Sequence, residues 1–189
     1  AAGLVEFNGH YYYAEGGGRI FMNKSAWISN TNGLLEKGTY RFDAEGKMIR
    51  TTEVANENGT LYYYRDGKRT TNAGLIEFEG AYYHIDGGAK AQRDVTIWVS
   101  KPNGFFPVGS YTFGSDGKMI IYNGVKNGYY YVEGVKTSAG VVYEDGNYYY
   151  AEGGGKLVVN KSYWITRANN LLPVGTYRFG ADGKIDMST

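Results

Sequence analysis

The chain has 189 residues, and 42% of them are hydrophobic, which is enough apolar material to bury a core. Twenty Lys and Arg oppose 19 Asp and Glu, and this near-neutral balance disfavours nucleic acids and anionic membranes as partners. There is no Cys, and two His, His10 and His84, are too few for a zinc cluster. No apolar run reaches the length of a membrane span. We therefore expect no metal, no cofactor, no nucleic acid and no membrane insertion.

Three copies of one unit follow each other along the chain. "GLVEFNGHYYY" starts at Gly3, "GLIEFEGAYYH" at Gly74 and "GVVYEDGNYYY" at Gly140. Abundant Tyr and Gly with only 3 Pro are typical of strands joined by turns. The self-alignment predicts a single repeat array over 1–189, with units 3–73, 74–139 and 140–189, the last of them incomplete. We name these units repeats 1, 2 and 3.

A shorter period of about 20 residues lies within the repeats, and it indicates β-hairpins. Each hairpin is interpreted as an aromatic strand, a turn such as "DAEGK", "RDGK" or "SDGK", and a returning strand. A single hairpin is marginal in water, so the hairpins must stack on one another. The sequence therefore predicts an all-β fold, an elongated solenoid of about eight hairpins in two and a half to three tandem units. The eight candidates begin at Gly9, Gly38, Gly59, Gly80, Gly109, Gly128, Gly146 and Gly175.

Alternation along the strands separates the tyrosines into two groups. The aromatic residues of "TYRF" and "SYTF" are expected to face the stack: Tyr40, Phe42, Tyr111 and Phe113. The outer members of each "YYY" triple are expected to do the same: Tyr11, Tyr13, Tyr148 and Tyr150. The middle members are expected to face outward and to offer rings to a ligand: Tyr12, Tyr83 and Tyr149. The same alternation extends this outward group to Tyr62, Tyr64, Tyr129 and Tyr131.

A tryptophan stands at the same place in every repeat, 24 positions after its first Gly: Trp27, Trp98 and Trp164. Each precedes a loop with apolar residues, such as "NTNGLL" or "KPNGFF". Two interpretations stay open. The rings cap the core beneath this loop, or they are exposed and stack on a ligand, in which case they are the first candidates for a glycan-binding site.

The repeated strings "GTYRFDAEGKM" and "GSYTFGSDGKM", with the tyrosine runs "GNYYYAEGGG" and "NGYYYVEGVK", resemble the choline- and glucan-binding repeats of bacterial cell-surface proteins and the related carbohydrate-binding repeats of clostridial toxins. The resemblance spans nearly the whole chain. It implies hairpins stacked in a superhelix that anchor a secreted protein to cell-wall or glycan polymers. It also implies a secreted, cell-wall-associated or extracellular protein of a Gram-positive bacterium, with its signal peptide outside this sequence.

The chain departs from the family at the tryptophans that cage choline. The first of them is replaced by Leu4, Leu75 or Val141, and the second by His10, Thr39, Ala81, Ser110, Asn147 or Thr176. A quaternary ammonium is held by several ring faces, best by Trp, so these replacements argue against choline. A neutral sugar on exposed Tyr or Trp remains, with weak sites strengthened by repetition along a polymer.

The carboxylates offer no catalytic pair. Glu15 with Glu152, and Asp116 with Asp182, recur in similar turns, whereas acid–base catalysis needs two different environments. We therefore expect a non-catalytic module that binds cell-wall or extracellular polysaccharide and anchors or targets a larger secreted protein. Two alternatives stay open: a passive structural stalk, and a protein-interaction repeat whose tryptophans contact a host or bacterial surface protein.

Overall fold

The computed structural model describes residues 2–188, which form strands, turns and one short 3-10 segment. No helix among them has the length and apolarity that crossing a membrane requires. The elements in chain order are β1 (Gly3–Phe7), β2 (His10–Ala14), β3 (Lys24–Ile28), β4 (Gly38–Phe42), β5 (Glu53–Glu57), β6 (Thr60–Arg65), β7 (Lys68–Arg69), β8 (Gly74–Phe78), β9 (Ala81–Ile85), β10 (Val95–Val99), β11 (Gly109–Phe113), β12 (Gly124–Lys126), β13 (Tyr129–Val132), β14 (Val135–Lys136), β15 (Gly140–Glu144), β16 (Asn147–Ala151), η1 (Gly153–Gly155), β17 (Lys161–Ile165) and β18 (Gly175–Phe179).

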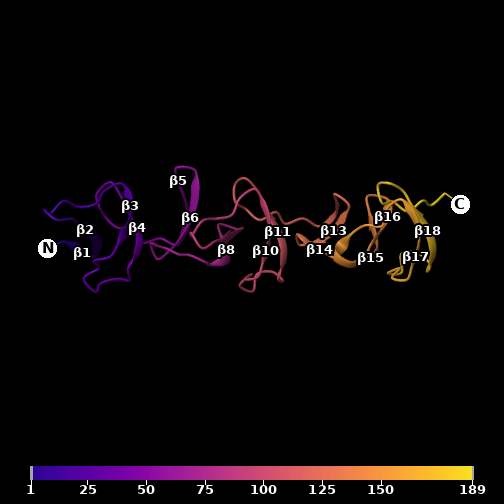
Figure 1. The fold of residues 1–189 in the computed structure, drawn as a ribbon, viewed down its shortest axis with the longest axis horizontal. Helices are drawn as coiled ribbons and strands as arrows, with labels where there is room; N and C mark the ends of the chain where they lie inside the picture. Colours follow the sequence, from indigo (N-terminus) through magenta and orange to yellow (C-terminus); the bar gives the residue numbers. More distant parts are fainter. Residues whose placement is uncertain (1, 189) are drawn as a thin grey trace. The chain divides into compact units, whose positions relative to one another are not determined.

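The prediction of an all-β fold built from hairpins is confirmed (Figure 1). Eight pairs of consecutive strands within residues 2–188 form the predicted hairpins: β1-β2, β3-β4, β5-β6, β8-β9, β10-β11, β12-β13, β15-β16 and β17-β18. The short strands β7 and β14 pair in addition with β6 and β13. Strands β12, β13 and β14 form one three-stranded sheet, and a five-stranded sheet has the order β3-β4-β7-β6-β5.

The turns that close five of these hairpins precede the aromatic strand, which differs from the interpretation of the sequence. In β1-β2 the turn is Asn8-Gly9, with φ of 48° and 74°. Positive φ at both central residues matches the right-handed twist of the paired strands, and Asn or Asp followed by Gly tolerates it best. The same pattern recurs at Asn58-Gly59, Glu79-Gly80, Asn127-Gly128 and Asp145-Gly146.

The acidic turns that follow the aromatic strands reverse the chain as well, but in most places the returning segment pairs with the strand through a single β-bridge. After "DAEGK" the return is the bridge between Phe42 and Met48, and the Asp43 carboxylate accepts the Lys47 backbone N–H at 2.8 Å. Asp116 and Asp182 accept from Lys118 and Lys184 in the same way, at 3.0 and 3.1 Å. These aspartates therefore form turns, as their repeated surroundings indicate.

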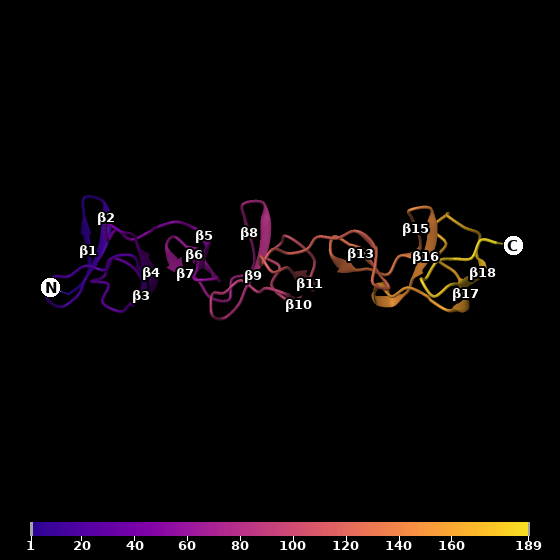
Figure 2. The ribbon, with the colours of Figure 1, turned by 90° about the horizontal axis from the view of Figure 1, so that it is seen from above.

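The chain divides into two compact bodies. Among residues 2–188, the N-terminal body comprises 2–95, 99–107 and 113–118, and the C-terminal body comprises 96–98, 108–112 and 119–188. In the N-terminal body, Leu4, Ile28, Tyr40 and Phe42 form one core, and β5-β6 packs against β8-β9 to form a second. Figure 2 shows the hairpins of each body from a second direction.

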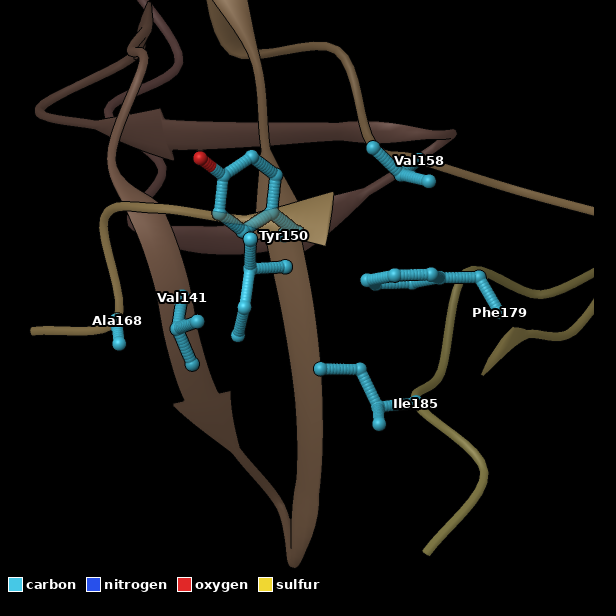
Figure 3. Packing of buried hydrophobic residues seen from close by; sticks show 7 residues of the cluster. Val141, Tyr150, Val158, Ala168, Phe179 and Ile185 are labelled. Carbon is cyan, nitrogen blue, oxygen red and sulfur yellow. The ribbon is translucent and has the colours of Figure 1, made fainter. Parts of the chain in front are cut away.

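The C-terminal body repeats this arrangement. The core of repeat 3 gathers Val141, Tyr150, Val158, Phe179 and Ile185 from four segments of the chain, and Figure 3 shows these side chains around one space. The prediction that Tyr150 faces inward holds, because only 7% of it is exposed. The expected inward faces of β4 and β11 hold as well: Tyr40, Phe42, Tyr111 and Phe113 are all buried.

An asparagine fastens the long loop of each repeat to its first strand. The Asn32 side-chain amide donates to the Leu4 carbonyl at 2.8 Å, and the equivalent Asn103 and Asn169 donate to Leu75 and Val141 at 2.7 and 2.8 Å. All three asparagines have positive φ, which Asn accepts more readily than most residues. The loop is thereby held over the core, with Leu35 and Leu172 packed beneath it.

Candidate functional site

The three tryptophans lie on the surface. Trp27 is 66% exposed, Trp98 65% and Trp164 59%, although each stands in the middle of a strand. The next residues, Ile28, Val99 and Ile165, are fully buried, so strand alternation turns each Trp ring outward. The interpretation that these rings cap the core is therefore wrong. Leucines such as Leu35 and Leu172 fill the space beneath the loops instead.

Hydroxyl and guanidinium groups share the outward sheet face with the tryptophans. Trp27 pairs with Thr39 across β3-β4, and Trp164 pairs with Thr176 across β17-β18. Beside Trp164, residues Ser162, Thr176 and Arg178 line a pocket of about 380 Å³. An exposed indole with donors and acceptors around it matches a sugar ring, whose apolar C–H face stacks on the indole while the hydroxyls around its edge form hydrogen bonds.

A polar pocket also lies on the face that carries Trp98. Thr96 and Thr112 share a hydrogen bond of 2.7 Å between their hydroxyls, and both line a pocket of about 290 Å³ together with Tyr122 and Lys126. Thr96 is two positions before Trp98, so the two side chains point to the same side of β10. The tryptophan positions of repeats 2 and 3 thus lie on sheet faces that carry polar hollows.

The middle tyrosines are not the outward rings that the alternation predicts. Tyr83 is 7% exposed and Tyr149 is 8% exposed, and Tyr12 is half-buried. The prediction is wrong because both faces of an internal hairpin are covered. One face lies on the core of its own repeat, and the other packs on the preceding hairpin. Tyr83 thus contacts the Tyr63 cluster, and Tyr149 the cluster that includes Val125 and Tyr130.

In hairpin β1-β2 the corresponding outer face is not covered by a preceding hairpin within residues 2–188. Val5 is 37% exposed and Phe7 64%, whereas Ile76 and Val142, at the position of Val5, are 6% and 8% exposed. Tyr12 pairs with Val5 across the strands and therefore belongs to this face. Of the three middle tyrosines, only Tyr12 keeps partial access to solvent.

Cations of the chain itself cover several of the remaining tyrosine rings. The Arg69 guanidinium lies 3.6 Å from the Tyr62 ring centre, and Lys136 Nζ lies 3.5 Å from that of Tyr129. Tyr64 is fully buried, contrary to the prediction, and the Arg41 guanidinium lies 4.1 Å from its ring centre. Strand alternation does not predict these cations. The signal was a Lys or Arg at one fixed place after the acidic-Gly turn, Arg69 in repeat 1 and Lys136 in repeat 2.

The two histidines lie in different environments. His10 is exposed, and His84 is half-buried beside Phe113, with ring centres 6.1 Å apart. Burial lowers the pKa of His84, and the Asp86 carboxylate opposes this change. No group of three or more His, Asp or Glu within residues 2–188 could hold a metal ion.

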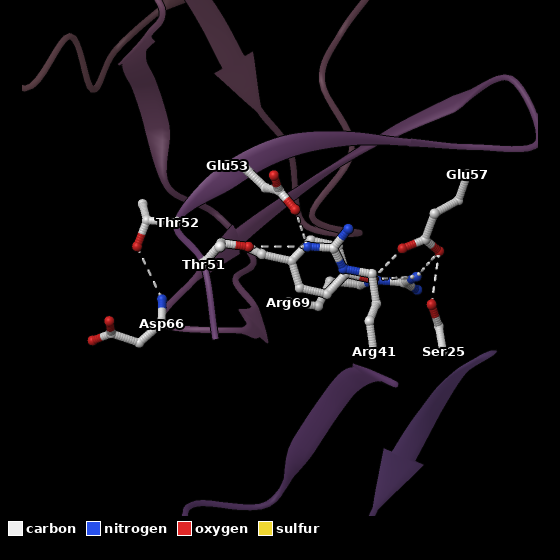
Figure 4. Close-up of polar contacts among 9 residues, drawn as sticks. Ser25, Arg41, Thr51, Thr52, Glu53, Glu57, Asp66 and Arg69 are labelled. Carbon is white, nitrogen blue, oxygen red and sulfur yellow. Dashed lines mark hydrogen bonds and ion pairs between the residues drawn. The ribbon is translucent and has the colours of Figure 1, made fainter. Parts of the chain in front are cut away.

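A network of polar and charged side chains joins β5 to β3, β4, β6 and β7 (Figure 4). Arg41 pairs with Glu53, Arg69 donates to Glu57 at 2.7 Å, and Glu57 also accepts from Ser25 and Tyr64. Partial burial raises the pKa of Glu53, but the hydrogen bond and charge of Arg41 outweigh it, so the pKa ends below its ordinary value.

We expect Arg41→Met to remove an acid-dependent part of the stability. Because the pKa of Glu53 is lowered in the folded protein, its ionised carboxylate stabilises the fold at pH values above the unfolded-state pKa of about 4.5. This contribution to stability is lost as the pH falls through the folded-state pKa. At pH 7 the variant should lose about 1–3 kcal/mol, the range for hydrogen bonds to charged groups. Urea unfolding of wild type and variant between pH 7 and pH 3 measures both effects.

Arg178→Met is the matched control, because Arg178 has the same place in repeat 3 but is exposed. Its cost should stay within about 0.5 kcal/mol. Equal losses for Arg41→Met and Arg178→Met at pH 7 would contradict a stabilising role for the Arg41–Glu53 pair.

Solved structures with a similar fold include choline-binding repeat proteins of Streptococcus pneumoniae. The modular autolysin LytC matches with a TM-score of 0.66 and 12% sequence identity, over 98% of this chain and 38% of the autolysin. Choline binding protein F matches with a TM-score of 0.55 and 21% identity, over 99% of this chain and 58% of that protein. The choline-binding domain of CbpL matches with a TM-score of 0.54 and 23% identity, over 100% and 99% of the two chains.

These similarities establish the fold, which is that of choline-binding repeat domains. No protein-family model matches the chain, and no curated protein matches it. The chain spans less than two thirds of LytC and of choline binding protein F.

Proposed function

We propose that this chain is a non-catalytic repeat module that binds cell-wall or extracellular polysaccharide, with Trp27, Trp98 and Trp164 as the stacking residues. The observation that carries the proposal is the exposure of all three indoles at one equivalent strand position. Exposing three large aromatic rings is unfavourable for a passive stalk. A polymer that contacts several weak sites at once gains affinity from their repetition.

The similar structures support a wall polymer as the ligand. LytC was determined in complex with a synthetic peptidoglycan ligand, and choline binding protein F in the presence of a tetrasaccharide-pentapeptide analogue of peptidoglycan. For this chain we propose a polysaccharide rather than choline. The cage tryptophans are replaced at positions such as Leu4 and Leu75, and Arg69 and Lys136 already cover the rings of Tyr62 and Tyr129.

The proposed setting is the bacterial cell surface, where the module anchors or targets a larger secreted protein. A protein-interaction role is the second candidate, and the same observation favours it, because exposed Trp is also the residue most enriched at interface hot spots. A host or bacterial surface protein would then be the partner. Binding to purified polymers distinguishes these two functions.

We expect the purified module to co-sediment with insoluble Gram-positive cell walls or glucans, and the triple variant Trp27→Ala/Trp98→Ala/Trp164→Ala to lose this binding. Loss of stacking should weaken the affinity by more than about tenfold, or 1.4 kcal/mol. Because the indoles are exposed, the variant should fold, which circular dichroism checks. Free choline should not release the bound protein.

Tyr143→Ala is the matched control, since Tyr143 is 55% exposed on β15 but does not occupy the tryptophan position. It should pellet like wild type. Absence of pelleting with every polymer, or an unchanged affinity of the folded triple variant, would overturn the proposal.

A further inference from the structure

A cationic pocket lies in the N-terminal body, where the loop before β4 meets the turn between β6 and β7. It has a volume of about 440 Å³, and Tyr40 and Leu35 contribute to its wall. The ionised side chains that line it are Arg50, Arg65, Lys68, Arg69, Glu36 and Asp66. Four positive and two negative groups give the lining a formal charge of 4 − 2 = +2, whereas the whole chain carries only +1.

Two of these cations have unused donors. Arg50 donates through Nε to the Asp66 carbonyl at 2.8 Å, and Arg65 donates through Nε to the Tyr63 hydroxyl at 3.4 Å. The hydrogen bonds within residues 2–188 leave the terminal nitrogens of both guanidiniums free. A guanidinium fork with free terminal N–H groups matches the two oxygens of a phosphate or carboxylate.

An oxyanion of the chain itself already occupies one side of this pocket. The Glu36 carboxylate accepts a hydrogen bond from Lys68 Nζ at 2.5 Å, and this bond with the Lys68 charge lowers the pKa of Glu36. The Glu36 side chain is 82% exposed, so no packing holds it in place. Another oxyanion can therefore displace it from Lys68.

Repeat 2 provides an internal comparison, because its corresponding positions carry few charges. By alignment of the turns "RDGK" and "VEGV", Val132 and Val135 replace Arg65 and Lys68, and by alignment of "GKMIR" and "GKMII", Ile121 replaces Arg50. The backbone is equivalent, since the turns at Gly67 and Gly134 have φ of 79° and 80°. The turn geometry therefore does not require the three cations of repeat 1.

We propose that the pocket formed by Arg50, Arg65 and Lys68 binds an oxyanion of the phosphate or carboxylate class. This site is separate from the tryptophan face and takes a different chemistry. The two free guanidinium forks contact the anion, and Lys68 exchanges its bond to Glu36 for one to the ligand. The anion can be a substituent of a polymer or a free ion.

The test is a titration of the whole chain with inorganic phosphate, followed by backbone amide and arginine side-chain signals in NMR spectra. We expect saturable shifts around Gly67 and Thr71 and at the Arg50 and Arg65 side chains, and none around Gly134. Sodium chloride at the same ionic strength should not produce these shifts. A second titration with acetate distinguishes phosphate from carboxylate, and a third with a poly(glycerol phosphate) distinguishes a free ion from a polymer substituent.

Two variants make the test specific. Arg50→Ile/Arg65→Val/Lys68→Val gives repeat 1 the residues of repeat 2 and should weaken phosphate binding by at least about tenfold. Glu36→Gln should strengthen it about two- to fivefold, because Lys68 loses its competing carboxylate. A purely structural role for the cations does not explain this opposite effect. The Trp27/Trp98/Trp164 triple variant should bind phosphate as wild type does, so failure of the polysaccharide proposal leaves this one standing.

A charge-matched control replaces three cations outside the pocket, Arg19→Gln/Lys118→Gln/Lys184→Gln, and lowers the net charge by the same three units. This control variant should retain the phosphate-induced NMR shifts. Its lower net charge should weaken phosphate binding only slightly, through the loss of long-range electrostatic attraction. Shifts that do not saturate, that appear equally around Gly134, or that fall equally in the charge-matched control would overturn the proposed site.

Discussion

Tyr149→Ala is expected to destabilise the C-terminal body by about 3–5 kcal/mol, the range for truncating a large buried aromatic side chain. The ring is 8% exposed and lies between hairpin β15-β16 and the preceding hairpin, against Val125 and Tyr130. Its removal leaves a cavity at the contact of two hairpins, which is the contact that holds stacked repeats together. Urea unfolding followed by circular dichroism measures the loss.

Tyr12→Ala is the matched substitution at the same place in repeat 1. Tyr12 is half-buried, and its cross-strand partner Val5 is 37% exposed, so the cost should be about 1 kcal/mol. The comparison keeps the residue type, the strand position and the neighbouring tyrosines constant. Equal costs for Tyr12→Ala and Tyr149→Ala would show that the covered face contributes nothing beyond the hairpin itself.

Gly155→Ala should cost about 2–5 kcal/mol, because it combines backbone strain with a collision. Gly155 has φ of 75°, and a Cβ there would lie 2.6 Å from the Thr137 nitrogen and 2.7 Å from the Tyr130 carbonyl oxygen. These backbone atoms cannot move without separating β13 from the 3-10 segment η1. Positive φ costs a residue with a Cβ about 1–2 kcal/mol, and overpacking adds about 1–3 kcal/mol.

The neighbouring glycine separates the two contributions. Gly154 has φ of 68°, and a Cβ there would meet no atom within 4 Å, so Gly154→Ala should cost only the 1–2 kcal/mol or so of the strained φ. Gly18, the equivalent of Gly155 in the first "YYYAEGGG", has φ of 79° with open space around it and should behave like Gly154. A similar midpoint of urea unfolding for Gly155→Ala and Gly154→Ala would contradict the proposed collision.

Repetition makes the fold predictable from the sequence. Eight regularly spaced Gly positions predict the hairpins, and alternation correctly places Tyr40, Phe42, Tyr111 and Phe113 inside. The turns are harder to assign, because Asn8-Gly9 and "DAEGK" both suit a reversal of the chain. Only the pairing of the strands shows that Asn8-Gly9 closes a full hairpin, whereas "DAEGK" is followed by a single β-bridge.

The candidate site is less predictable, because alternation identifies the two faces of a strand but not what covers them. A hairpin in an array has a neighbour on each side, and this buries Tyr83 and Tyr149 on the face that seemed free. The tryptophans are exposed instead of buried. The sequence does not decide between the two, because a large aromatic residue next to an apolar loop is compatible with either. The cations over Tyr62 and Tyr129 depend on side-chain geometry, which the period of the sequence does not specify.

The short reach of the contacts has a consequence for how the chain folds. Asn169 bonds to the carbonyls of Ala139 and Val141, 30 and 28 positions earlier, and Ile185 bonds through its backbone to Tyr148, 37 positions earlier. The entropy lost on closing a loop grows with its length, so contacts within one repeat cost less than contacts across the whole chain would. The long loop of each repeat meets its own first strand before the next repeat has been synthesised, so the array can fold repeat by repeat and present each exposed tryptophan as its repeat is completed.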